Sequence, residues 1–412
     1  MLFTQGWRQA RIGAGILAVL TVTALGPLGS SASAAVAAPT ITDLGTLGGA
    51  GSSAAAVSGD IVVGQASTAD GDQHAFAYDL GAAHPAMVDL GTLGGNLSGA
   101  NAVSGDIVAG ISYTASNAEH AFAYDLGAAH PVMIDMGTLP GGSYSFDSGV
   151  SGKIVVGDAD TASGAEHAFA YDLGAAHPVM IDLGTLPSGS YSDATAVSGE
   201  IVVGYADTAS GDSHAFAYDL AAPHPHMIDL GILPGGSNSF ANAVSGDIVT
   251  GDADNGSGGT DTFAFAYDLA APHPHMVDLG TLRGGSFSVA NAISGDVVAG
   301  YADTAGGDGH AFAYDLGSAH PHMVDLGTLP GGDNSQAYEA SGDIVAGDAD
   351  TASGDQHAFA YDLGAARPAM VDLGTLSGGT YSQAYGVSGD IVAGVSDTAS
   401  GEFAVVWTVT GH

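Results

Sequence analysis

The side chains best suited to chemistry in this sequence are aspartates that recur in short polar stretches. One copy reads Asp348-Ala-Asp350-Thr-Ala-Ser-Gly354-Asp355. Several carboxylates beside a glycine could supply the six to eight oxygens that Ca²⁺ takes. We therefore predict Ca²⁺ loops, with these candidate ligands: Asp158, Asp160, Asp207, Asp212, Asp252, Asp254, Asp303, Asp308, Asp348, Asp350 and Asp355.

The same stretches have a plainer interpretation. Asp, Ser and Gly are common turn formers, and the spacing lacks the terminal Glu of a helix-loop-helix calcium site. The second copy, residues 111–119, has no aspartate pair at all. A solvated hairpin loop is therefore the favoured alternative.

Aromatic residues vary from copy to copy near these acidic stretches. Such rings could stack on sugars or meet a protein partner, although some could instead begin a buried strand. The candidate ligand-binding residues are Tyr144, Tyr191, Phe240, Phe287 and Tyr381.

Histidines occur in two settings. Pairs such as His224 and His226 flank a proline and could hold Zn²⁺ or Cu²⁺, but other copies have a single histidine or Arg367, which favours an exposed turn. The histidine of the triplet His-Ala-Phe appears six times in equivalent places. That symmetry favours a structural hydrogen-bonding role, because an active site needs different groups converging on one substrate.

All these residues belong to one repeat. The aspartate of Asp-Leu-Gly or Asp-Met-Gly recurs every 46 to 49 residues, at Asp43, Asp89, Asp135, Asp182, Asp229, Asp278, Asp325 and Asp372. Within the repeat between Asp182 and Asp229, four short apolar runs are separated by turn residues, at 193–198, 201–206, 214–220 and 227–231. Four strands in about 47 residues are typical of a propeller blade. A parallel β-helix is the alternative, but it would need distinct end caps.

The ends of the repeat array predict closure. Residues 41–45 correspond to the last strand of a repeat, whereas residues 402–409 correspond to the third. The first strand can therefore complete the last blade and leave no free edge. We predict an all-β fold, a single eight-bladed β-propeller over residues 39–412.

Strand alternation predicts how the blades pack. It places His214, Phe216 and Tyr218 on one face of their strand, and Ala215 and Ala217 on the other. A bulky face of one blade could then meet a small-residue face of its neighbour, which would make these aromatic residues core.

The repeat resembles the HAF-repeat family of extracellular bacterial repeats, which are named for His-Ala-Phe followed by an aromatic residue and Asp-Leu-Gly-Thr-Leu-Gly-Gly. The triplet begins at His74, His120, His167, His214, His310 and His357, and is replaced by Phe263-Ala-Phe and Phe403-Ala-Val in two copies. The strand order also looks like a Kelch blade. The resemblance implies an exported propeller and no catalytic residue.

Composition limits the partners. The chain has 412 residues with 44 Asp and Glu against 5 Lys and Arg, and no Cys. Such an acidic chain is not expected to bind nucleic acid. Residues 1–38 read as a secretory signal peptide and short leader, with Arg8 and Arg11 before an apolar run and Ala32-Ser33-Ala34 as a cleavage site. We expect an extracellular protein without membrane insertion once the signal is removed.

These observations together predict a secreted, non-enzymatic binding or scaffold propeller. Half of the acids are expected on or near one face, which would be the binding surface for an extracellular protein or glycan, and we expect a monomer. Two alternatives stay open, a Ca²⁺-dependent carbohydrate-binding module and a polysaccharide-active enzyme. No cofactor other than Ca²⁺ is expected.

Overall fold

The computed structural model describes residues 39–256 and 262–409. The fold described here is that of the unit Pro39–His412. The signal peptide predicted for residues 1–38 lies outside the described residues. Within those residues, no helix is long and apolar enough to cross a membrane.

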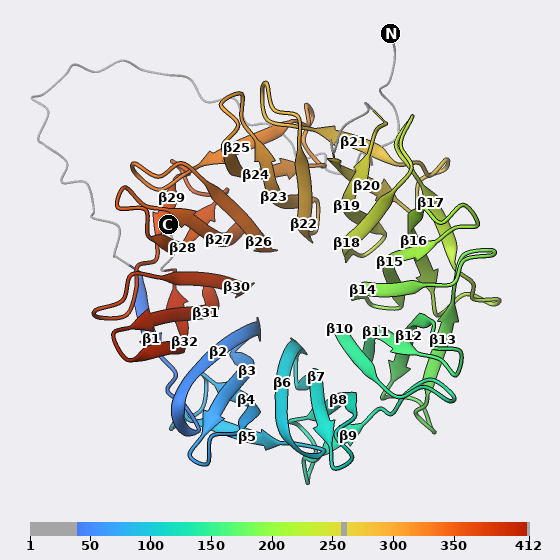
Figure 1. Ribbon diagram of the computed structural model, residues 1–412. Helices are drawn as coiled ribbons and strands as arrows, with labels where there is room; N and C mark the ends of the chain where they lie inside the picture. Colours follow the sequence, from blue (N-terminus) through green and yellow to red (C-terminus); the bar gives the residue numbers. More distant parts are fainter. Residues whose placement is uncertain (1–38, 257–261, 410–412) are drawn as a thin grey trace, which may run out of the picture. The chain divides into compact units, whose positions relative to one another are not determined.

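In the described residues, thirty-two strands form eight four-stranded blades around a common axis (Figure 1). Each blade is an antiparallel meander in which the first strand lies nearest the axis and the last lies at the periphery. The eight-bladed propeller predicted from the repeat is confirmed.

The strands of the first four blades are β2 (Gly48–Ser58), β3 (Ile61–Thr68), β4 (Gln73–Asp79) and β5 (Met87–Gly91); β6 (Gly94–Ser104), β7 (Ile107–Thr114), β8 (Glu119–Asp125) and β9 (Met133–Asp135); β10 (Ser145–Ser151), β11 (Ile154–Asp160), β12 (Glu166–Asp172) and β13 (Met180–Gly184); β14 (Ser192–Ser198), β15 (Ile201–Asp207), β16 (Ser213–Asp219) and β17 (Ile228–Gly231).

The strands of the last four blades are β18 (Ser239–Ser245), β19 (Ile248–Asp254), β20 (Thr262–Asp268) and β21 (Val277–Gly280); β22 (Ser288–Ser294), β23 (Val297–Asp303), β24 (Gly309–Asp315) and β25 (Met323–Gly327); β26 (Ser335–Ser341), β27 (Ile344–Asp350), β28 (Gln356–Asp362) and β29 (Met370–Asp372); β30 (Ser382–Ser388), β31 (Ile391–Thr398), β32 (Gly401–Thr408) and β1 (Thr40–Asp43).

The eighth blade joins the two ends of the propeller. Its outer strand, β1, pairs antiparallel with β32, with Ile41 opposite Trp407. The amide of Leu44 continues the pairing with a 2.9 Å hydrogen bond to the carbonyl oxygen of Ala404. The closure predicted from the termini of the repeat array is therefore confirmed.

The core consists of similar clusters between adjacent blades. In one of them, Phe216 and Tyr218 of β16 pack with Ala168 and Ala170 of β12, which belongs to the preceding blade. This is the predicted contact of a bulky face with a small-residue face. Close packing also explains Gly204 in β15, because a Cβ there would collide with the carbonyl oxygen of Asp193.

One serine in each inner strand links adjacent blades. The hydroxyl of Ser239 accepts a 2.8 Å hydrogen bond from the amide of Ala215 and donates a 2.6 Å bond to the carbonyl oxygen of Gly231, both in the preceding blade. Buried backbone polar groups are costly without partners, so this serine satisfies two at once. The equivalent residues are Ser52, Ser98, Ser145, Ser192, Ser288, Ser335 and Ser382.

Candidate functional site

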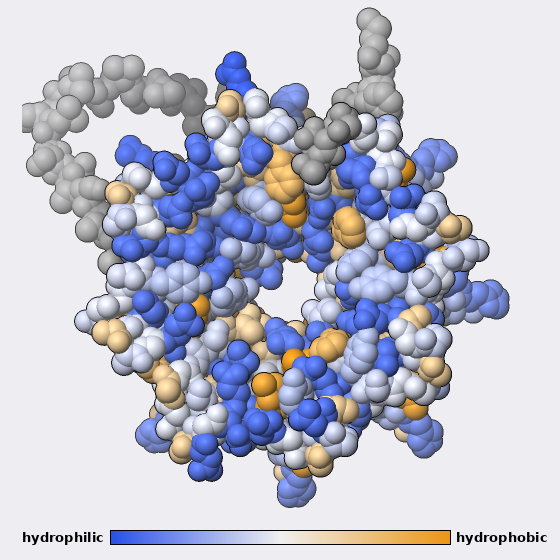
Figure 2. Space-filling model, viewed as in Figure 1, coloured by the Kyte–Doolittle hydropathy of each residue, from blue (hydrophilic) through white to orange (hydrophobic). Residues whose placement is uncertain are grey.

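A cavity lies on the propeller axis. It has a volume of about 450 Å³ and is lined by residues of all eight inner strands. Figure 2 shows its opening at the centre of the ring. Ligand sites in proteins are typically hollows of about 300–1,000 Å³, so this axial channel is the first candidate site.

A β-bulge in every inner strand shapes the channel wall. In β14, the pairing with β15 shifts between Ala194 and Ala196, which leaves Thr195 as the bulged residue. Bulges redirect side chains and often occur beside functional sites. The repeats differ from one another at this position, which is occupied by Ala55, Asn101, Ser148, Thr195, Asn242, Asn291, Tyr338 and Tyr385.

Several bulged residues also join neighbouring blades. The side-chain amide of Asn242 donates a 2.9 Å hydrogen bond to the carbonyl oxygen of Ala290 in the next blade, and Asn291 donates a 2.7 Å bond to Ala337. Thr195 makes the equivalent 2.7 Å bond to Ala241. These bonds hold polar side chains in fixed positions on the channel wall.

Asn101 instead donates a 2.9 Å hydrogen bond to the carboxylate of Asp147 in the next blade. Asp147 is buried at a position where the other seven inner strands have alanine. Its second carboxylate oxygen has no hydrogen-bond partner among the described residues. Burial raises the pKa of this carboxyl from 3.8 to about 7, despite the opposing hydrogen bond from Asn101.

Glu339 is the one acidic residue that lines the channel. It follows the bulge at a position where the other blades have alanine or glycine. Burial raises the pKa of its carboxyl from 4.5 to about 7, although the amide of Ala340 donates to it. Tyr385 also lines the channel, with 37% of its surface exposed. The channel therefore combines fixed polar groups with a single titratable carboxyl.

Sequence reasoning missed Glu339, Tyr385 and the bulged asparagines. The signal that could have identified them is variation between the repeats. The bulged residue and the residue after it differ from blade to blade, whereas the serines before and after them are the same in every inner strand.

The aspartates predicted to bind Ca²⁺ lie in different places from those expected. Most of them are in the second strand of a blade, as Asp348 and Asp350 are in β27, and only Asp212, Asp308 and Asp355 lie in the following loop. That loop is a hairpin, in which Thr351 and Asp355 share a 2.8 Å backbone hydrogen bond. The predicted loop was therefore too long, because the strand continues through the first two aspartates.

The carboxylates near the strand ends are already occupied by protein donors. Asp254 accepts from the amides of Ser237 and Asn238 at 2.6 and 3.1 Å, and from both of their side chains. Asp160 accepts from the amides of Ser143 and Tyr144 and from the hydroxyl of Ser143. Burial raises the pKa of both carboxyls, but these hydrogen bonds outweigh it and hold the pKa below its ordinary value.

Other predicted ligands are kept apart or buried. Burial and the charges of Asp193 and Glu166 raise the pKa of Asp158 to about 7, and burial raises the pKa of Asp252 and Asp348. In the described part of the chain, no group of three or more His, Asp and Glu side chains could hold a metal ion. The Ca²⁺ loops and the solvated-hairpin alternative both stay predictions. The remaining predicted ligands, Asp207, Asp212, Asp303 and Asp308, form no such group either.

The predicted ligand-binding aromatics are half-buried and contact other side chains. The ring of Tyr191 lies 5.8 Å from that of Tyr205, and Phe287 lies 5.5 Å from Tyr301. Phe240 is not equivalent to the others, because it lies within β18 and packs edge-on against Tyr205 at 5.1 Å. Tyr144 and Tyr381 donate 2.5 Å hydrogen bonds to Glu166 and Gln383.

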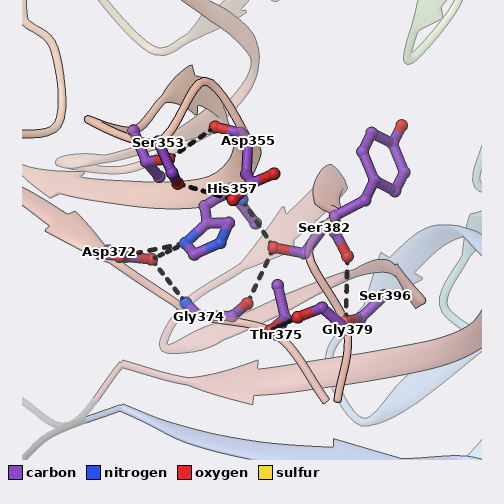
Figure 3. Close-up of polar contacts among 12 residues, drawn as sticks. Ser353, Asp355, His357, Asp372, Gly374, Thr375, Gly379, Ser382 and Ser396 are labelled. Carbon is purple, nitrogen blue, oxygen red and sulfur yellow. Dashed lines mark hydrogen bonds and ion pairs between the residues drawn. The ribbon is translucent and has the colours of Figure 1, made fainter. Parts of the chain in front are cut away.

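The repeated histidine has the structural role that was expected. Nδ1 of His357 lies 3.0 Å from the carboxylate of Asp372, which also accepts from the amide of Gly374 (Figure 3). The part of the chain that the structure describes has six such pairs, at 2.8–3.0 Å: His74–Asp89, His120–Asp135, His167–Asp182, His214–Asp229, His310–Asp325 and His357–Asp372. The paired histidines lie in the proline-containing turn between the third and fourth strands of a blade. There, Nδ1 of His226 lies 3.1 Å from the carbonyl oxygen of His224.

No family model matches this chain, and no curated protein matches it. Solved structures resemble it in fold. A structure from a study of two prolyl endopeptidases matches 78% of this chain and 50% of its own, with 12% identity and a TM-score of 0.52. A puromycin-hydrolyzing peptidase of Mycobacterium tuberculosis matches 86% and 60%, with 14% identity and a TM-score of 0.48. The β-propeller domain of the Trilobed protease from Pyrococcus furiosus matches 75% and 96%, with 10% identity and a TM-score of 0.44.

One of these matches corrects the function predicted from the sequence. The non-enzymatic binding or scaffold role with an acidic working face was wrong, because the solved structure that shares the fold with a TM-score of 0.52 comes from a study of two prolyl endopeptidases. The chain spans only 50–60% of the length of that structure and of the puromycin-hydrolyzing peptidase. The HAF resemblance, export of the chain and the absence of a nucleic-acid partner stay predictions.

Proposed function

We propose that this propeller is a peptide-handling domain whose axial channel takes the amino-terminal end of a short peptide. The observation that carries the proposal is Glu339, a single carboxyl in a channel of about 450 Å³ whose lining is otherwise uncharged. A carboxylate in a partly desolvated hollow favours one positive charge close to it.

The channel wall suits a peptide in two further ways. Ala196, Gly149 and their equivalents leave the channel open, because they have small side chains at the position that Glu339 occupies in its own blade. The fixed amides of Asn242 and Asn291 place polar groups on that wall. The shared fold with a structure from prolyl endopeptidases supports peptides as the ligand class, and the proposal assigns no peptidase active site to this chain.

The test is calorimetric titration of the full-length protein with trialanine and with N-acetyl-trialanine, at pH 8 and fixed ionic strength. At that pH the Glu339 carboxyl, with its pKa of about 7, is largely ionised. We expect the free amine to bind at least about tenfold more tightly than the acetylated peptide, which corresponds to about 1.4 kcal/mol.

Glu339→Gln should abolish that difference, whereas Glu200→Gln, at an exposed turn outside the channel, should preserve it. Trialanine that fails to bind, or that binds no better than its acetylated form, would exclude the proposed role of the channel.

A further inference from the structure

A second cavity lies away from the axis, where the sixth and seventh blades meet. Its volume is about 210 Å³, equivalent to roughly seven waters at about 30 Å³ each. The wall includes Tyr301 and Gly309 from the sixth blade and six residues of the seventh: Asn334, Ser335, Gln336, Asp348, Asp350 and Gln356. None of these residues lines the axial channel.

Two departures from the repeat explain why space is open at this boundary. Gly309 begins β24 at a position where the other third strands have Gln, Glu, Ser or Thr. A Cβ added at Gly309 would meet no atom within 4 Å. Asn334 stands where three other blades have Tyr144, Tyr191 and Tyr381. A shorter side chain at each position leaves room that a longer one would reduce.

The wall of this pocket is held in place by hydrogen bonds. The side chain of Asn334 accepts a 3.2 Å bond from the amide of Gly309 and donates a 2.9 Å bond to Asp350. Gln356 donates to Asp348, which also receives a 3.4 Å bond from Gln383. Side chains that are fixed in this way need little ordering when a ligand binds.

The pocket is lined by two carboxyl groups and by no basic side chain. Asp348 is only 2% exposed, and no lysine or arginine lines the wall beside it and Asp350. Burial raises the pKa of the Asp348 carboxyl, although Tyr338 and Gln383 donate to it. A buried carboxylate is stabilised by a positive partner, and an aromatic ring such as that of Tyr301 can also attract a cation. The lining of this pocket therefore suits a positively charged ligand better than a neutral or negative one.

We propose that this pocket binds a small organic cation with a guanidinium or ammonium group, held by the carboxylates of Asp348 and Asp350 and by the amide side chains of Gln336 and Gln356. The proposal is independent of the axial channel.

The probe is methylguanidinium, with N-methylurea as a neutral molecule of nearly the same shape. Each is titrated into the full-length protein at constant ionic strength and followed by saturation-transfer NMR. We expect saturable binding of methylguanidinium, at least about tenfold tighter than that of N-methylurea.

Gly309→Gln is the decisive variant, because it fills the pocket with the side chain that Gln356 places at the same position of its own blade. It should weaken methylguanidinium binding at least about tenfold without changing the net charge. Asn334→Tyr should act in the same direction and serves as the second variant if Gly309→Gln fails to fold. Asp355→Asn, in the hairpin loop outside the pocket, is the control and should leave binding unchanged.

Equal binding by the wild type and the filled variants would overturn the proposal, since it would show general attraction of cations to an acidic surface. The absence of saturable binding to the wild type would overturn it as well. Trialanine binding in the axial channel should be the same in wild type and Gly309→Gln, which keeps the two sites distinguishable.

Discussion

The amide of Gly59 donates a 2.9 Å hydrogen bond to the hydroxyl oxygen of Ser388, although the two residues are 329 positions apart. The same contact joins every pair of adjacent blades, for example Gly105 to Ser58 at 3.1 Å. The last blade is thus attached to the first in the same way as any other neighbour. We call the boundary between the last and the first blade the seam of the ring, and we expect it to be no less stable than the other boundaries between blades.

Ser52→Ala tests the strength of that seam. Ser52 accepts from the amide of Ala404 and donates to the carbonyl oxygen of Gly45. Its loss leaves a buried donor unpaired, which should lower the free energy of unfolding by about 1–3 kcal/mol. Ser239→Ala removes the same two bonds at an internal boundary and should cost the same in urea denaturation. A much larger loss for Ser52→Ala would show that the closure is a weak point.

Asp147→Ala should stabilise the protein at neutral and alkaline pH. The folded chain raises the pKa of this carboxyl from 3.8 to about 7, so its ionisation opposes folding. The wild type should therefore lose stability as the pH rises from about 4 to about 7, by an amount on the order of a few kcal/mol. The variant lacks this loss, and Asn101 could then donate to the backbone carbonyl of residue 147, as Asn242 does to Ala290.

The measurement for Asp147→Ala is the difference in thermal stability between variant and wild type at pH 4, 6 and 8. The gain should be largest at pH 8 and smallest at pH 4. A gain that is constant with pH would contradict a raised pKa, and a loss of stability at pH 8 would contradict an unfavourable buried charge.

His214→Phe should be tolerated. Exposed ion pairs contribute only about 0–1 kcal/mol, and Phe263 and Phe403 occupy the equivalent position in two blades. We expect the free energy of unfolding, measured by denaturation, to change by no more than about 1 kcal/mol. Phe216→Ala, at a fully buried position of the same strand, should cost about 3–5 kcal/mol. A comparable loss from both substitutions would assign the His–Asp pair a larger structural role.

Calcium should produce no specific stabilisation. The carboxylates of Asp160 and Asp254 already accept several hydrogen bonds from the protein, and a ligand stabilises only what it binds. Thermal unfolding in Ca²⁺ should match unfolding in Mg²⁺ at equal ionic strength, before and after chelation. A saturable shift with Ca²⁺ alone, lost in Asp254→Asn, would restore the calcium prediction.

The sequence could predict the architecture because repetition makes each local signal appear eight times. The spacing of Asp-Leu-Gly gave the number of blades, and the strand alternation of His214 to Tyr218 gave the packing of bulky against small faces. The unmatched terminal strands predicted the pairing of β1 with β32. Each of these predictions depends on a pattern that repeats along the backbone and that can be recognised in the sequence of one repeat at a time.

The sites were predicted less well, because they depend on where the repeat fails. Asp348 looked like a loop ligand in the sequence, but β27 continues to Asp350, and this places Asp348 in a pocket beside Gln356. In the sequence, nothing distinguishes Glu339 from the other 43 acidic residues. In the structure, it follows a bulge and lies at the axis, where no other acid lines the channel. The sequence alone determined the ring, since every blade repeats the same bonds. Only the tertiary structure decided which of many similar side chains face a hollow, because that depends on contacts between blades.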